Sequence, residues 1–252
     1  MSKRRIRIIF KKVRNANLNY KLIENGDRIA VALSGGKDSF TMLYFLNLLK
    51  KYTPLCFDMV PIYIDLGWEN DTKPLVDFCK TLNLELIIEQ TNIGHVVFTN
   101  RQEKNPCSLC SNLRRGALNR VAKLHNCNKL ALGHHLDDVV HTLFMSILYE
   151  SRFNVFKPST YLSRMEITMI RPLIYVEERD ILLFVESMGF NTVINRCPAD
   201  GQTKRHKVAE ILDKIEESHP GARQRILSSL ENVGPDCFWQ PLPKELPDIG
   251  LS

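Results

Sequence analysis

Residues 34–39 combine glycines, hydroxyls and a lysine in the way that a phosphate-binding loop requires. The two glycines let backbone N–H groups approach an anion because no Cβ stands in the way. The lysine and the two serine hydroxyls add donors, and the helical pattern that follows turns its positive dipole end toward the same anion. The spacing is not that of a Walker A loop, Gly-x-x-x-x-Gly-Lys-Ser/Thr. The loop consists of Ser34, Gly35, Gly36, Lys37, Asp38 and Ser39.

This run resembles the Ser-Gly-Gly-x-Asp-Ser motif of the PP-loop ATP pyrophosphatases. The resemblance implies a loop that holds the pyrophosphate end of ATP and leaves the α-phosphorus open to attack. Lys37 and the loop N–H groups would neutralise charge on the departing pyrophosphate, with Mg²⁺ sharing that work. Lys37 and Asp38 are therefore candidate catalytic residues. A plain glycine turn is the alternative, and six matching residues between a strand and a helix argue against it.

Two cysteines, Cys107 and Cys110, stand at the start of a helix predicted over 108–125. The helix dipole lowers the thiol pKa there and favours thiolate. Three kinds of site fit the pair: a thioredoxin-like redox site, a structural zinc site completed by His95 or another cysteine, and an iron–sulfur cluster held by three cysteines with one iron left open. For the cluster, Cys197 in a polar loop is the best third ligand.

A second polar cluster leaves the predicted strand 129–132 and enters a helix predicted over 136–150. Its members are Gly133, His134, His135, Asp137, Asp138 and His141. The carboxylates suit the first turn of a helix as caps. They can also hold Mg²⁺ together with ATP, or fix the loop by accepting backbone N–H bonds, and a dinuclear metal site is a further alternative. We expect ATP contacts from Gly133, His134, Asp137 and Asp138, and from Asp65 at the end of another strand; the role of His141 stays open.

Apolar strand-like runs alternate with helical patterns along the chain, which predicts a parallel sheet with helices on both faces. The expected fold class is α/β and Rossmann-like, with ligands at the carboxyl ends of the strands where the strand order reverses. The resemblance of residues 34–39 to the PP-loop further implies an adenine nucleotide alpha hydrolase-like fold. Pro61 weakens the case for its strand, since proline cannot donate to a ladder. The predicted strands are 29–33, 58–65, 84–88, 129–132 and 167–170; the predicted helices are 37–50, 71–82, 108–125, 136–150, 177–188 and a charged stretch at 204–233, with a loop over 91–106.

Positive charge is spread unevenly over the 252 residues, whose formal net charge is +6. Residues 1–14 carry seven lysines and arginines and no acidic residue. Such an arm either attracts a polyanion or is simply a solvated surface. We divide the chain into a basic N-terminal arm (1–25), a PP-loop nucleotide-binding domain (26–196), a C-terminal helical extension (197–234) and an irregular tail (235–252). The candidate RNA phosphate contacts are Arg4, Arg5, Arg7, Lys11, Lys12, Arg114, Arg115, Lys204 and Arg205.

Several classes of protein are excluded by composition. The apolar stretch at residues 8–10 is too short for a secretory signal, and no run approaches the ~18 apolar residues of a membrane span. We therefore expect a cytoplasmic protein without membrane contact. In that reducing compartment, seven cysteines indicate metal or redox chemistry sooner than disulfides. Cys56, Cys79 and Cys127 have apolar neighbours and are expected to be ordinary hydrophobic side chains, while Cys237 indicates nothing.

Five motifs in one order resemble the tRNA 2-thiocytidine synthetase family, the TtcA-like PP-loop sulfurtransferases. They are Ser34–Ser39, Pro-Cys-Ser-Leu-Cys (106–110), Leu-Arg-Arg-Gly (113–116), Ala-Leu-Gly-His-His-Leu-Asp-Asp (131–138) and Arg-Pro-Leu (171–173). The resemblance implies an enzyme that adenylylates the C2 oxygen of a tRNA cytidine in the anticodon loop and replaces that oxygen with sulfur. It also implies a [4Fe–4S] cluster on Cys107, Cys110 and Cys197 that carries the sulfide. The implied partners are tRNA, a sulfur donor (a cysteine desulfurase or free sulfide) and a second copy in a homodimer.

Two departures from the family pattern leave details open. Position 194 is isoleucine where many relatives have a second Cys-x-x-Cys, and His141 stands where relatives often carry Glu or Gln. The base is also open, as similar enzymes thiolate uridine. Three alternatives remain. The first is a PP-loop ligase or amidase and the second is a uridine thiolase, either one with a structural zinc site. The third is a non-catalytic zinc-stabilised RNA-binding protein. The intact phosphate loop weighs against the non-catalytic alternative.

Overall fold

A six-stranded sheet lies at the centre of the computed structural model, which describes residues 3–68, 70–100, 106–190, 204–234 and 237. Its strand order is β3-β2-β1-β4-β6-β5, and every pair is parallel except β5 with β6. The predicted α/β class is confirmed. The strands are β1 (Arg28–Leu33), β2 (Asp58–Asp65), β3 (Ile87–Gln90), β4 (Lys129–Ala131), β5 (Ser159–Leu162) and β6 (Ile167–Ile170).

The strand order reverses between β1 and β4. From β1 the chain adds β2 and β3 on one side, then returns to place β4 on the other side of β1. A crevice opens at the carboxyl ends of strands at such a switch point. The phosphate loop follows β1 and the His-Asp cluster follows β4, so the topology brings both motifs to this one place.

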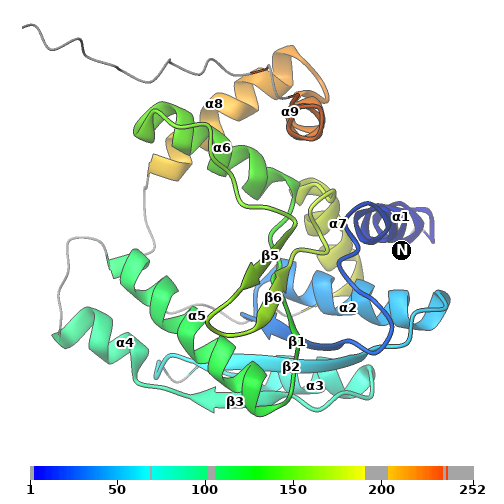
Figure 1. Cartoon of the computed structure of the whole chain (residues 1–252), viewed down its shortest axis with the longest axis vertical. Helices are drawn as coiled ribbons and strands as arrows, with labels where there is room; N and C mark the ends of the chain where they lie inside the picture. Colours follow the sequence, from blue (N-terminus) through cyan, green and yellow to red (C-terminus); the bar gives the residue numbers. More distant parts are fainter. Residues whose placement is uncertain (1–2, 69, 101–105, 191–203, 235–236, 238–252) are drawn as a thin grey trace, which may run out of the picture.

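Helices cover both faces of the sheet (Figure 1). One apolar core joins the sheet to α1 (Lys3–Tyr20), α2 (Lys37–Tyr52), α3 (Lys73–Thr81), α6 (Leu136–Glu150), α7 (Glu178–Met188), α8 (Lys204–Ser218) and α9 (Ala222–Glu231). A second core lies under α4 (Ile93–His95), the π-helix Val96–Asn100 and α5 (Pro106–Leu124). The central strands are buried on both sides, which explains why they read as continuous apolar runs.

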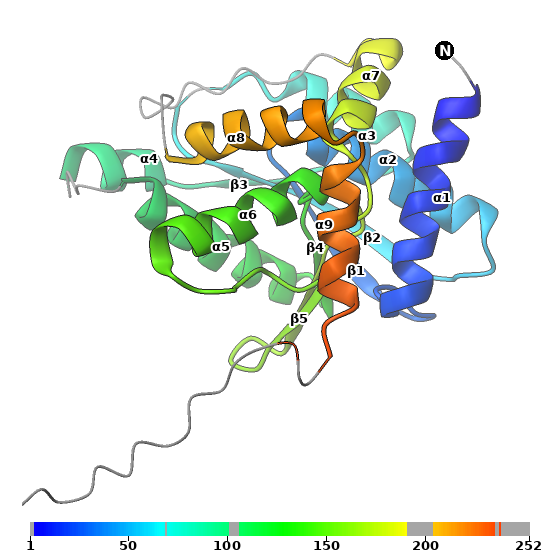
Figure 2. The ribbon, with the colours of Figure 1, turned by 90° about the horizontal axis from the view of Figure 1, so that it is seen from above.

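The basic N-terminal segment is a helix, α1, that packs against α2 and α7. Ile9, Val13 and Ala16 are buried on one face. Lys12 pairs with Glu177 at 3.0 Å and with Asp180 at 2.8 Å. Figures 1 and 2 both place α1 on the side of the molecule away from α5. The apolar residues between the charges therefore dock the helix, while most of its basic side chains face outward.

The structure differs from the sequence expectations in three segments. Residues 91–106, predicted as a loop, contain α4 and the π-helix. β3 lies three residues beyond the start of the predicted strand 84–88. β5 was not predicted at all; it is a short edge strand whose ladder depends on β6. Pro61 does not interrupt β2: it lies opposite Val31, and pairing with β3 begins one residue later. In the described residues no helix is long and apolar enough to cross a membrane.

Candidate active site

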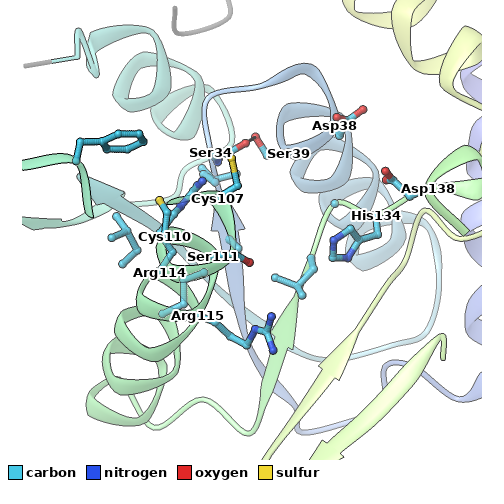
Figure 3. A pocket seen from close by; sticks show the side chains of 17 residues that line it. Ser34, Asp38, Ser39, Cys107, Cys110, Ser111, Arg114, Arg115, His134 and Asp138 are labelled. Carbon is cyan, nitrogen blue, oxygen red and sulfur yellow. Dashed lines mark hydrogen bonds between the residues drawn. The ribbon is translucent and has the colours of Figure 1, made fainter. Parts of the chain in front are cut away.

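A cavity of about 540 Å³ opens at the carboxyl ends of β1 and β4 (Figure 3). Three segments supply its polar walls: the phosphate loop with the start of α2, the first turns of α5, and the loop from β4 into α6. The polar lining includes Ser34, Asp38, Ser39, Cys107, Cys110, Ser111, Arg114, Arg115, His134 and Asp138, together with the main chain of Gly133. Of the residues predicted to contact ATP, the described lining leaves out Gly35, Gly36, Lys37, Asp65 and Asp137.

The phosphate loop is closed by its own hydrogen bonds. Ser39 Oγ donates to the Gly36 carbonyl at 2.8 Å and accepts from the Ser34 N–H at 3.3 Å, while Ser34 Oγ accepts from the Gly36 N–H. Gly35 has φ of +81°, a left-handed conformation that favours glycine. Gly36 is the N-cap of α2 and no side chain caps the helix there. The first turn of α2 can therefore donate its N–H groups to an anion.

Lys37 faces carboxylates. Its Nζ lies 3.2 Å from Asp38 Oδ2 and 2.9 Å from Glu178 Oε1. Burial lowers the pKa of Lys37, but these two carboxylates outweigh it and the pKa is raised overall. Burial raises the pKa of Asp38, and the neighbouring Lys37 and His135 offset only part of that rise. Lys37 is thus a cation held at the edge of the loop by two acidic partners.

The two thiols of the Cys-x-x-Cys motif lie on the cavity side of α5, facing the phosphate loop (Figure 3). Cys107 is exposed and Cys110 is half-buried. Thiolates are soft ligands that suit iron–sulfur clusters and zinc. Within the described part of the chain no three His, Cys, Asp or Glu side chains are grouped to hold a metal ion. Cys197, the predicted third ligand, lies outside the described residues.

The carboxylates at the start of α6 are engaged with protein partners. Asp138 Oδ2 accepts the His135 N–H at 3.1 Å in a capping box, and its other oxygen pairs with Arg205. Asp137 Oδ2 accepts the Glu178 N–H at 2.7 Å, and Oδ1 lies 3.2 Å from Arg223 Nε. Of the roles considered from the sequence, these contacts show helix capping by Asp138 and acceptance of a backbone N–H bond by Asp137.

The imidazoles beside these carboxylates have opposite pKa shifts. Burial lowers the pKa of His135, but the Asp137 carboxylate 3.6 Å from Nδ1 and the charges of Asp138 and Asp38 raise it overall. Burial lowers the pKa of His141, with the Arg205 charge acting in the same direction. His141 does not line the cavity described above. It lies near enough to Asp137 and Asp138 for their charges to oppose that lowering of its pKa.

The candidate RNA contacts fall into separate places. Arg114 and Arg115 line the cavity. Arg205 pairs with Asp138 and Lys12 pairs with Glu177 and Asp180, so both charges are partly neutralised. The remaining candidates on α1, which are Arg4, Arg5, Arg7 and Lys11, lie on the side away from α5 (Figures 1 and 2). The side chain of Lys204 is outside the described residues.

Three functional candidates were missed by the sequence reasoning. Phe98, on the π-helix, and Ser111, on α5, line the cavity. A π-helical turn often marks a functional site, but it has no sequence signal of its own. Arg171 was used only as part of a motif, yet it is buried and contacts His134. An arginine placed directly after an apolar strand was the available signal.

Comparisons with known proteins agree with this geometry. Residues 3–212 match the PP-loop domain family. A tRNA-cytidine(32) 2-sulfurtransferase from Geobacter metallireducens is 36% identical over 239 residues, 93% of each chain. An Aliivibrio fischeri relative of that name is 36% identical over 226 residues, covering 88% of this chain and 73% of the relative. The solved structure of the U34-tRNA thiolase NcsA from Methanococcus maripaludis, with its [4Fe-4S] cluster, is 30% identical with a TM-score of 0.74, covering 90% of this chain and 78% of that one.

Proposed function

Because this chain belongs to the tRNA 2-thiocytidine synthetase family of PP-loop sulfurtransferases, we propose that it thiolates a tRNA cytidine with ATP. The cytidine O2 attacks the α-phosphorus of ATP, an O–P bond forms, and pyrophosphate leaves with the electron pair of the broken P–O bond. Sulfide then adds at C2, and AMP leaves with the former O2. The single observation that carries the proposal is one cavity lined both by the phosphate loop and by two thiols.

The phosphate loop is assigned the nucleotide. Ser34 and the uncapped start of α2 supply donors to the phosphates, and Gly35 and Gly36 let the backbone approach them. The Ser39 hydroxyl donates to the Gly36 carbonyl and so shapes the loop. Lys37 and Asp38 stand at the edge of this loop, where Lys37 can turn from Glu178 toward the leaving pyrophosphate. Preorganised charge of this kind often contributes more to an enzyme's rate enhancement than any other single effect.

The thiol side of the cavity is assigned the sulfur chemistry. We assign Cys107 and Cys110, which line this cavity, as two ligands of a [4Fe–4S] cluster, with Cys197 as the third. Such a cluster, held by three cysteines, would leave one iron open to bind sulfide. The two thiols that α5 brings to the cavity suit such a soft metal group better than they suit Mg²⁺.

Further parts of the proposal concern partners. Mg²⁺ accompanies ATP; if Asp138 binds it, Asp138 must leave Arg205. Arg114 and Arg115 contact the phosphates of an anticodon loop whose target base is splayed into the cavity. The sulfide comes from a cysteine desulfurase or from solution, the protein works as a homodimer, and it acts in the cytoplasm. None of these partners is needed to explain the cavity itself.

Cytidine is favoured over uridine and over a ligase reaction. The relatives from Geobacter and Aliivibrio are cytidine sulfurtransferases, whereas the solved neighbour is a U34 thiolase. A ligase or amidase needs the phosphate loop but gives no reason for two thiols in the same cavity. The thiols thus favour sulfur as the incoming nucleophile.

Nucleoside analysis of tRNA tests the function. Cells lacking this protein should lose 2-thiocytidine and regain it with the wild-type chain, whereas a Cys197→Ser chain should fail to restore it while still binding ATP. Anaerobically purified wild-type protein should be brown and contain iron. A loss of 2-thiouridine in place of 2-thiocytidine would assign the base to uridine, and colourless protein with stoichiometric zinc would reject the cluster. Unchanged thionucleosides in the deletion strain would reject the proposal.

A further inference from the structure

Arg171 is a buried cation with an unusual set of partners. It follows β6 and is only 5% exposed. Its guanidinium carbon lies 4.7 Å from the centre of the Phe156 ring, and Nη1 donates to the carbonyl of Lys157. Among the described residues no carboxylate forms an ion pair with it. Burying a guanidinium without a carboxylate partner costs free energy. We therefore looked to the remaining contact of Arg171 for a function that would explain its burial.

That contact is with His134. Arg171 Nε lies 3.3 Å from His134 Nδ1, with the N–H directed at the ring nitrogen. Burial and the charge of Arg115 lower the pKa of Arg171 only to about 10, so the guanidinium stays protonated at neutral pH. A protonated guanidinium donates and cannot accept. His134 Nδ1 must therefore carry a lone pair, and the proton of the neutral ring must be on Nε2.

The surroundings keep this imidazole neutral and fixed. Burial lowers the pKa of His134 to about 4, with Arg171 and Arg205 acting in the same direction and Asp138 opposing them. The Phe156 ring packs against the imidazole with ring centres 5.0 Å apart. Phe156 thus contacts both partners of the hydrogen bond and holds their relative positions.

His134 is also placed next to the phosphate loop. It lines the cavity on the side opposite the two cysteines (Figure 3). The preceding residue, Gly133, packs on the start of α2 so closely that a Cβ there would lie 3.3 Å from the Asp38 carbonyl carbon. His134 is thus an imidazole that lines the cavity beside this loop, and its Nε2 is the ring nitrogen that Arg171 does not contact.

We propose that Arg171 and Phe156 are positioning residues that hold His134 as the Nε2-protonated tautomer, and that this N–H donates to a non-bridging oxygen of the ATP α-phosphate. The proposal rests on the proposed function. During attack of the cytidine O2, charge builds on those oxygens as the new O–P bond forms and pyrophosphate departs; His134 keeps its proton throughout. A fixed neutral donor stabilises that charge, whereas the opposite tautomer would present a lone pair to the phosphate.

The first test reads the tautomer directly and needs no activity. Nitrogen-15 NMR of the wild-type protein near neutral pH, with the His134 signals assigned by their loss in His134→Gln, should show protonated Nε2 and unprotonated Nδ1. Arg171→Met should convert them to a mixture of tautomers. Arg164→Met, which removes an exposed arginine, is the matched control and should leave the His134 signals unchanged. Protonated Nδ1 in the wild-type protein overturns the proposal, whatever the enzyme turns out to modify.

The second test measures tRNA-dependent pyrophosphate release. His134→Ala should lower kcat by about 10²-fold, the usual loss for one preorganised donor, whereas His134→Gln, whose amide N–H can replace Nε2–H, should lower it by no more than about tenfold. His134→Asn, whose amide matches Nδ1 instead, should behave like alanine. Arg171→Met should lower kcat strongly in the wild-type background. It should lower kcat little in the His134→Gln background, because glutamine has no tautomer for Arg171 to fix.

The outcomes separate this proposal from the proposed function. If the NMR signals agree but His134→Gln is as slow as His134→Ala, donation to the phosphate is wrong. If Arg171→Met costs the same in both backgrounds, the arginine does not act through His134. If the variants change pyrophosphate release as expected but no sulfur enters tRNA, the proposed tautomer and phosphate contact of His134 are supported and the proposed thiolation is rejected.

Discussion

The two walls of the cavity are built in different ways. The phosphate loop takes all its residues from one run of six, and its serines bond to their own backbone. The α5 wall presents thiols and arginines into the cavity, and its proposed metal group needs a cysteine 87 residues further on, since 197 − 110 = 87. The phosphate loop itself is therefore formed locally, whereas the proposed metal group depends on a distant part of the chain.

Serine substitution of a thiol should separate the two walls most sharply. Cys107→Ser is expected to abolish 2-thiocytidine formation, because serine is a hard ligand that does not replace a thiolate on iron. ATP binding should be retained, since the phosphate loop closes on its own bonds. Mass spectrometry of tRNA nucleosides and nucleotide-binding assays measure the two effects. Cys56→Ser, at an exposed cysteine outside the cavity, is the matched control; a loss of ATP binding in Cys107→Ser would show that the walls are not independent.

An alanine substitution at Gly35 tests the phosphate loop. Gly35→Ala forces a Cβ onto a residue at φ +81°, which costs about 1–2 kcal/mol and displaces N–H groups that face the phosphate. We expect pyrophosphate release to fall by on the order of 10²-fold. Gly26→Ala, at φ +87° with open space around it, carries the same backbone cost away from the cavity. Equal losses of activity in the two variants would mean that the glycine matters only for stability.

Substitutions of basic residues on α5 and on α1 compare how much each helix contributes to tRNA binding. Arg115→Met should weaken tRNA binding several-fold and reduce the slope of log affinity against log salt by about 0.7–0.9, since Arg115 lines the cavity. Lys11→Met, on the far side, should change the slope less. Binding curves at several salt concentrations decide this. A larger effect at Lys11 would move the main tRNA footprint to α1.

Two aspartates should respond to pH with opposite signs. Burial raises the pKa of Asp38, so its ionised form weakens folding at neutral pH and this penalty disappears in acid. Burial also raises the pKa of Asp137, but the neighbouring His135 imidazole and the Glu178 N–H outweigh it and the pKa is lowered. Ionised Asp137 therefore stabilises the fold above its ordinary pKa of 3.8, and that stability is lost as pH falls through the folded pKa.

Urea unfolding of two variants measures these signs. At about pH 7, Asp38→Asn should raise the free energy of unfolding and Asp137→Asn should lower it, each by on the order of 1 kcal/mol. Near pH 3 both differences should shrink. Destabilisation by Asp38→Asn at neutral pH would indicate that this carboxylate stabilises the fold as Asp137 does. The two aspartates would then not differ in their effect on stability.

Most central elements could be predicted because their signals are local. β2 and α6 have the predicted bounds, 58–65 and 136–150, since apolar periodicity and helix-start signals lie within the segments themselves. β5 could not be found in this way: its residues are half-exposed, and its hydrogen bonds come from β6. The π-helix at residues 96–100 likewise has no pattern that separates it from a loop.

By itself the sequence determined the phosphate loop, the thiol pair and the parallel α/β architecture, because each depends on residue types at short spacing. Only the tertiary structure decided that Asp137 and Asp138 are held by Arg223 and Arg205 from α9 and α8, and that Arg171 lies against His134. Those pairs join segments that are 37 or more residues apart. Their formation depends on how the helices and strands pack, which no local pattern encodes.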